Sequence, residues 1–143
     1  MRNTTYLLSL ITITALFGPL GCFTLHKSDS ATLQETWKGH EVGAAPQGPL
    51  ASFVITGKAF EFRGANPNEW YKGTFSLRED TQPRQFIAVI TECAAPQYAG
   101  KTANAIYKIE ADTLTLAATE PGSLTVPTGF DAPGIRGFAL KKE

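Results

Sequence analysis

Cysteine, histidine and methionine are rare in this chain, which has two, two and one of them among 143 residues. So few cysteines and histidines offer little for a closed zinc site, and the acidic pairs beside turns lack the regular oxygen spacing of a calcium loop. An excess of charge is also missing, because 13 basic residues stand against 13 acidic ones. We therefore expect no metal, no cofactor and no nucleic-acid partner.

The length suits one compact domain and leaves no room for a second core. A hydrophobic fraction of 43% excludes a disordered chain. With 13 glycines and 9 prolines, the composition favours many short elements joined by turns over a few long helices. The bulk of the fold is therefore expected to be β.

The first 21 residues have the pattern of an export signal. Arg2 supplies a positive charge before the apolar run Tyr6–Phe17, which is too short for an ordinary membrane span. The run is followed by Gly21-Cys22, and a small residue before cysteine resembles the bacterial lipobox. This resemblance implies that Cys22 carries lipid and anchors an exported lipoprotein of the cell envelope to the membrane. The alternative is ordinary cleavage near Ser28–Ser30, which releases a soluble periplasmic or extracellular protein.

A polar segment separates this signal from the folded part. We predict a signal peptide over residues 1–21, a tether over residues 22–32 and a lipocalin-like barrel domain over residues 33–143. With lipid on Cys22, Cys93 is a lone thiol. Without lipid, and if cleavage spares Cys22, a disulfide between the two is conceivable in an oxidising compartment.

Apolar and polar residues alternate with period two along most of the chain, and turns interrupt them every eight to twelve residues. This pattern predicts an antiparallel all-β fold. One helical turn can form within Ser30–Thr36, before the first strand. The predicted strands are Thr36–Val42, Ala51–Thr56, Ala59–Arg63, Trp70–Arg78, Gln85–Thr91, Ala103–Glu110, Thr113–Ala118 and Gly137–Lys142.

Two tight hairpins predict which residues face the interior. Gly57-Lys58 suits a type II′ turn, which sets Ile55 opposite Phe60 on one face. The loop Ala111-Asp112 collects the apolar residues of its two strands on one face in the same way. The predicted inward residues are Phe53, Ile55, Phe60, Phe62, Tyr71, Phe75, Leu77, Tyr107, Ile109, Leu114, Leu116, Phe138 and Leu140.

Most of these strands are apolar on one face only, and Phe86–Ile90 alone is apolar on both. Eight short antiparallel strands with one interior close most economically into an up-and-down barrel, which also removes exposed edges. The predicted fold is thus an all-β, eight-stranded antiparallel barrel after an N-terminal signal or lipoprotein peptide. A barrel of this size is filled by side chains or holds one small ligand.

Four stretches of the chain carry a family resemblance: Leu33–Trp37, Tyr71–Phe75, Ile106–Leu116 and Pro127–Phe130. Together they are similar to a bacterial family of small exported lipocalin-like proteins of unknown function, over most of Leu33–Glu143. The resemblance implies a lipocalin-like barrel, often behind a signal or lipoprotein peptide, and brings no established activity.

Lipocalins also stack an arginine near the last strand on a tryptophan near the first, to close one end of the barrel. The matching residues in this chain are Trp37 and Arg136. Antiparallel pairing of the first and last strands places the start of one beside the end of the other, which keeps Trp37 and Arg136 apart. They could meet only if the segment 119–136 crossed the open end of the barrel and placed Arg136 there. That long segment can form a lid over a barrel mouth or a passive wrap.

Catalytic residues are hard to find in the sequence. Nucleophilic catalysis needs a base within reach of an activated nucleophile, and the two histidines, His26 and His40, read as tether and surface residues. Cys93 reads as a structural thiol at a strand end. We therefore predict a protein that is not an enzyme.

Aromatic side chains are the remaining candidates for a binding site. We predict that Trp37, Phe60, Phe62, Tyr71, Phe75, Tyr107 and Phe130 line the barrel and bind a small apolar or amphipathic ligand. The alternative is a filled barrel that serves as a structural or protein-interaction module of the cell envelope. A cavity of roughly 300 Å³ or more would favour the binding module.

Overall fold

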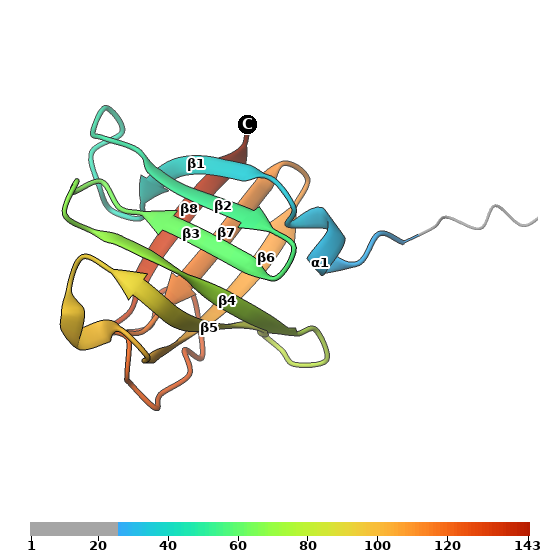
Figure 1. Ribbon diagram of the computed structural model, residues 1–143. Coiled ribbons are helices and arrows are strands. Elements are labelled where there is room, and N and C mark those ends of the chain that lie inside the picture. The colour runs from blue at the N-terminus through green and yellow to red at the C-terminus, as the bar shows by residue number, and fades with distance from the viewer. Residues whose placement is uncertain (1–25) are drawn as a thin grey trace, which may run out of the picture.

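The computed structural model describes residues 26–143, and Figure 1 shows a β-barrel with a short helix at one end. The predicted signal peptide and the lipidation site Cys22 lie outside the described residues. In the part that is described, no helix is long and apolar enough to cross a membrane. The elements are α1 (Asp29–Thr32), β1 (Thr36–Glu41), β2 (Ala51–Thr56), β3 (Ala59–Arg63), β4 (Trp70–Arg78), β5 (Arg84–Cys93), the 3-10 helix η1 (Pro96–Tyr98), β6 (Thr102–Glu110), β7 (Thr113–Ala118) and β8 (Arg136–Lys142).

The eight strands pair in chain order and close into a barrel. Each strand runs antiparallel to its neighbour, and β1 is hydrogen-bonded to β8 as well as to β2. The predicted all-β up-and-down barrel is therefore confirmed. Closure leaves no sheet edge open to another chain.

The predicted hairpin registers are also confirmed. Ile55 lies opposite Phe60, and Tyr107 lies opposite Leu116. Gly57 has a φ of 61°, as the first central residue of a type II′ turn requires. Ala111 occupies the same place in the β6–β7 turn with a φ of 52°, a backbone conformation that suits glycine better than alanine.

Several element limits differ from the prediction, most of them by one residue. The helical turn begins at Asp29 rather than Ser30 because the Ser28 hydroxyl caps it, accepting a hydrogen bond from the Ala31 amide at 3.3 Å. Strand β5 continues to Cys93 instead of ending at Thr91. A bulge lets it do so, because Lys72 pairs with Glu92 while Gly73 pairs with Ile90.

The core is one cluster inside the barrel. Ten of the thirteen predicted inward residues are buried there, and Tyr71, Leu77 and Ile109 pack half-buried against them. On β5, which reads as apolar on both faces, the inward Phe86, Ala88 and Ile90 are buried while Val89 is 42% exposed. Alternation along each strand thus divides the molecule into one interior and one outer surface.

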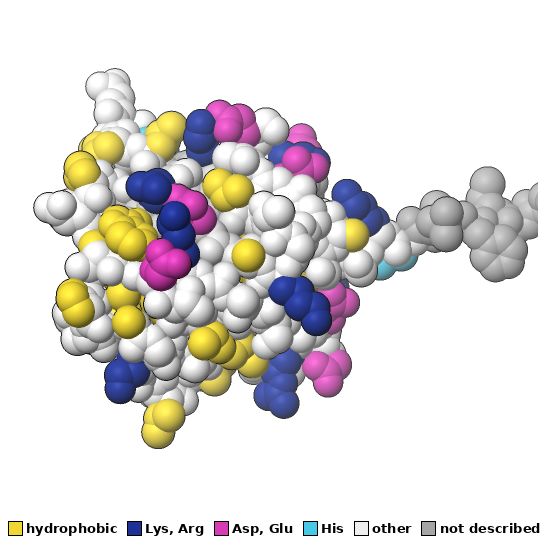
Figure 2. Space-filling view, in the orientation of Figure 1, with side chains coloured by type: hydrophobic (Ala, Val, Ile, Leu, Met, Phe, Trp, Pro, Cys, Tyr) yellow, Lys and Arg dark blue, Asp and Glu magenta, His cyan; other side chains and the backbone are white. Residues whose placement is uncertain are grey.

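The outer surface mixes charges of both signs, as Figure 2 shows on one face of the molecule. On β3, Glu61 pairs with Arg63 at 2.6 Å and with Lys72 of β4 at 3.6 Å. Pairs as exposed as these contribute little to stability. They keep this face free of a large single-sign patch.

The segment between β7 and β8 lies against two parts of the barrel, the outer wall and the rim of a cavity. Its middle covers the outer wall: Ile106 and Ala117 pair on the outward face, yet both are fully buried. The Phe130 ring lies near them, with the ammonium nitrogen of the outward Lys108 at 5.6 Å from the ring centre. The two ends of the segment, at Thr119–Pro121 and Gly134, border a cavity instead.

Candidate ligand-binding cavity

One end of the barrel is sealed by α1 and the residues that follow it. Leu33 and Trp37 are buried there, and the Trp37 indole nitrogen donates a hydrogen bond to the Leu33 carbonyl at 3.1 Å. The Gln34 side chain accepts from the Gly57 amide at 2.6 Å and donates to the Gly57 carbonyl at 2.9 Å. These bonds join the end of α1 to the β2–β3 turn.

A buried carboxylate ties α1 to the opposite wall. Asp29 accepts hydrogen bonds from the Tyr107 hydroxyl at 2.7 Å and from the Arg84 guanidinium at 2.8 Å. Burial, followed by the hydrogen bond to Asp29, raises the pKa of Tyr107 well above its usual value of 10. Tyr107 therefore stays protonated and keeps donating over the physiological pH range.

The other end of the barrel contains a cavity of about 420 Å³. Large apolar side chains from five strands form most of its wall. They are Phe53, Phe60, Phe62, Phe86, Ile90, Leu116 and Phe138.

Four alanines explain why this end is hollow. Ala88, Ala103, Ala105 and Ala118 all line the cavity. Each places a single carbon at an inward position, so the facing walls do not meet as they do around Tyr107 further along β6. Alternating small residues on neighbouring strands are a sequence signal of this hollow. A prediction of the interior that considers only the large inward residues misses this signal.

The aromatic wall is packed on itself. Phe86 stacks on Phe75 with ring centres 4.6 Å apart and 11° between the planes, and it meets Phe53 edge-on at 5.5 Å. Phe62 and Phe138 form another edge-on pair at 5.0 Å. Such contacts hold the rings in place, so the cavity is formed before any ligand enters.

Polar groups gather at the mouth of the cavity. Arg136, at the start of β8, donates to both carboxylate oxygens of Glu41 at 2.8 and 2.7 Å and to both oxygens of Glu69. The hydrogen bonds from Arg136 lower the pKa of Glu41, against the opposing effect of burial. The Tyr98 hydroxyl donates to Glu120, and this hydrogen bond raises the pKa of Tyr98.

The predicted lining residues divide between three places. Phe60, Phe62 and Tyr71 lie on the cavity wall. Trp37 and Tyr107 belong to the sealed end, and Phe75 lies behind Phe86. Whether the first group contacts a ligand stays a prediction.

The prediction that Phe130 lines the barrel is wrong. Phe130 lies on the outer wall beside Lys108, because its segment covers the outward Ile106. The sequence near Phe130 has no alternation that would indicate a face. Phe53, Phe86, Leu116, Phe138 and the charged rim were not among the predicted site residues.

The Trp37–Arg136 stack does not form. Trp37 pairs with Lys142 at the far end of β8, whereas Arg136 begins that strand at the cavity mouth, its guanidinium 5.3 Å from the centre of the Phe138 ring. Antiparallel pairing of β1 and β8 is the physical reason. The sealed end is closed by Asp29 and Tyr107 instead.

The two side chains considered above as nucleophile or base, Cys93 and His40, are not part of the cavity wall. Cys93 is a half-buried free thiol whose sulfur donates to the Ala95 carbonyl at 3.0 Å. His40 lies on β1, on the face opposite to Trp37 and Gly39. Over residues 26–143, no three His, Cys, Asp or Glu side chains come close enough to hold a metal.

Comparisons with protein-family models, curated proteins and solved structures find no match to this chain. The class of protein is therefore defined by its own geometry. It is a closed eight-stranded antiparallel barrel, sealed at one end and hollow at the other.

Proposed function

We propose that this protein is a non-enzymatic, exported binding module of the lipocalin-like kind, which holds one small apolar or amphipathic molecule in its barrel. The observation that carries the proposal is the cavity of about 420 Å³, whose wall is mainly aromatic and aliphatic. Transfer of an apolar molecule from water to such a wall is favourable by roughly 25 cal/mol for each Å² buried. A filled barrel that serves as an interaction module of the envelope would need a solid interior, so the cavity favours binding.

Attachment to a membrane is the second part of the proposal. The lipobox-like Gly21-Cys22 supports a lipid on Cys22. Residues His26–Ser28 lead into α1 at the sealed end of the barrel (Figure 1), and the cavity lies toward the other end. Roughly seven residues, of at most about 3.5 Å each, separate Cys22 from Asp29, so the barrel would sit within about 25 Å of its anchor. The mouth would then open away from the membrane.

Binding can be tested with N-phenyl-1-naphthylamine, a neutral apolar dye that fluoresces when it leaves water. The full chain should bind one dye molecule, with saturation. The double substitution Ala88→Leu with Ala105→Leu fills the cavity and should weaken binding at least tenfold. Ala59→Leu with Ala139→Leu adds the same atoms to exposed outward positions and should leave binding unchanged. Equal binding by both double variants would place the dye outside the cavity and overturn the proposal.

The anchor can be tested separately by growing cells with a clickable fatty acid. The wild-type protein should take up the label and Cys22→Ala should not, whereas Cys93→Ala should be labelled like the wild type. Label that survives Cys22→Ala would contradict lipidation at this residue.

A further inference from the structure

The charges at the cavity mouth are unequal in number. Arg136 is the single basic residue on the wall within the described chain, and Glu69 and Glu120 lie on the same wall. Glu41 is drawn to this end by its hydrogen bonds to Arg136. This end of the barrel therefore holds one guanidinium and three carboxylates, of which Arg136 pairs with Glu41 and Glu69, and two negative charges remain in excess.

Arg136 has little capacity left for a ligand. A guanidinium has five N–H donors, and the hydrogen bonds to Glu41 and Glu69 use both sides of its fork. An anionic head group, such as a fatty-acid carboxylate, would have to displace one of these carboxylates. It would then meet the other beside it.

Glu120, by contrast, is available to a cation. One of its oxygens accepts from the Tyr98 hydroxyl, and no basic side chain of residues 26–143 forms an ion pair with it. Lys101 passes beside Gly122 but is not part of the wall. The rings of Tyr71 and Tyr98, 6.2 Å apart, stand at the same mouth and can receive a cation on their faces.

The pKa of the Tyr71 hydroxyl responds to the same charges at the mouth. Burial raises its pKa most, and the nearby charge of Glu69 raises it next. Arg136 opposes this increase less strongly than Glu69 supports it, and Cys93 and Glu120 add smaller increases. A field that disfavours a phenolate at this point also disfavours an anionic head group, and it favours an ammonium group.

We infer that the cavity takes an amphipathic cation, with an apolar or aromatic body among the phenylalanines and a protonated amine at the mouth beside Glu120. The inference rests on the proposed binding function and specifies its ligand class. Neutral ligands with the same body should bind more weakly, and anionic ones more weakly still.

Three probes that share an indole body test this order: tryptamine, 3-ethylindole and indole-3-propionate. Each is used at pH 7 and low salt to displace N-phenyl-1-naphthylamine from the full chain. Tryptamine should bind at least tenfold more tightly than indole-3-propionate, with 3-ethylindole between them. Raising the salt to about 0.5 M should shrink the difference, because ions screen exposed charges.

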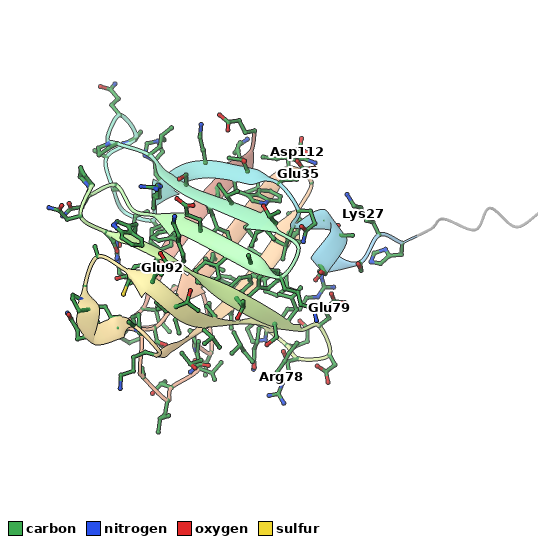
Figure 3. All side chains as sticks on the ribbon, viewed as in Figure 1. Lys27, Glu35, Arg78, Glu79, Glu92 and Asp112 are labelled. Atoms are coloured by element: carbon green, nitrogen blue, oxygen red, sulfur yellow. The ribbon has the colours of Figure 1, made fainter. Side chains whose placement is uncertain are left out.

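Glu120→Gln locates the preference. It should weaken tryptamine at least threefold and leave 3-ethylindole unchanged. The matched control is Glu79→Gln, which removes the same charge near α1 at the sealed end, where Figure 3 labels Glu79. This control should leave both probes unchanged.

The outcomes separate this inference from the function beneath it. If neither the dye nor 3-ethylindole binds, the binding function fails. If 3-ethylindole binds but tryptamine binds no more tightly, or indole-3-propionate binds best, the ligand class is wrong while the binding function stands. Equal effects of Glu120→Gln and Glu79→Gln would assign the preference to net charge and overturn the role of the rim.

Discussion

The two ends of this barrel are built from the same strands, yet one is solid and the other hollow. The difference lies in the size of the inward side chains along each strand. On β6, Ala103 and Ala105 line the cavity, and Tyr107 fills the sealed end. On β7, Leu114 is packed completely, whereas Leu116 borders the cavity. A gradient of side-chain volume within single strands therefore decides where a barrel of fixed strand number can hold a ligand.

The polar groups of the two ends differ in burial. Asp29 at the sealed end is 8% exposed and shared between two donors, whereas the side chains of the Glu41–Arg136 ion pair are 33% and 46% exposed. A buried hydroxyl that loses its acceptor has no substitute, but water replaces a lost partner at the rim. The polar groups of the sealed end should therefore contribute more to the free energy of unfolding than those of the rim.

The largest expected contrast comes from two leucines on one face of β7. Leu114→Ala should lower the free energy of unfolding by about 3 to 5 kcal/mol, and Leu116→Ala by about 2 kcal/mol, because Leu116 already borders empty space. Urea unfolding with an unchanged m-value measures both. Equal costs would contradict the contrast between the two ends.

Removing one carboxylate at each end comes next. Asp29→Ala should cost about 1 to 3 kcal/mol, since the Tyr107 hydroxyl is left buried without its acceptor. Glu41→Ala should cost at most about 1 kcal/mol because its ion pair is partly exposed to water. Asp29→Asn retains an oxygen acceptor and should recover part of the loss. Thermal or urea unfolding of all three would show whether the order is reversed.

Alkaline pH tests the same end through Tyr107. Its pKa is raised in the folded state, so its contribution to stability is complete below pH 10 and is lost as the pH rises further. Above pH 10 the wild type should lose up to about 1.4 kcal/mol more per pH unit than Tyr107→Phe. Titrations shared by the two proteins cancel in this difference. Parallel curves between pH 9 and 11 would refute the effect.

The smallest effect concerns the two-residue turns, both away from the cavity wall. Ala111 has a positive φ, so Ala111→Gly should stabilise the protein by about 1 kcal/mol. Gly57→Ala places a side chain in the same backbone conformation and should destabilise it by a similar amount. Both variants should bind the dye like the wild type. A loss of stability in Ala111→Gly would show that the turn is not strained.

Much of the fold was predictable because its signals are local. The Gly57 turn and the alternation of its two strands place Ile55 against Phe60, and a slip of one residue would put both in water. Ile106 illustrates the limit of this reading, because it has an outward position by alternation and yet is fully buried. Its cover comes from the segment of Phe130, which carries no periodic signal.

By itself, the sequence determined the strands, the registers of the β2–β3 and β6–β7 hairpins and the buried face of each strand, because each depends on residues close together in the chain. Only the tertiary structure brought the small residues Ala88, Ala103, Ala105 and Ala118 around one shared space, because a cavity is the space left between walls from distant strands. It also decided the partners of Arg136, which lie 95 and 67 residues away at Glu41 and Glu69. Closure of β1 on β8 brings such residues to one rim, and no local pattern encodes a contact at that separation.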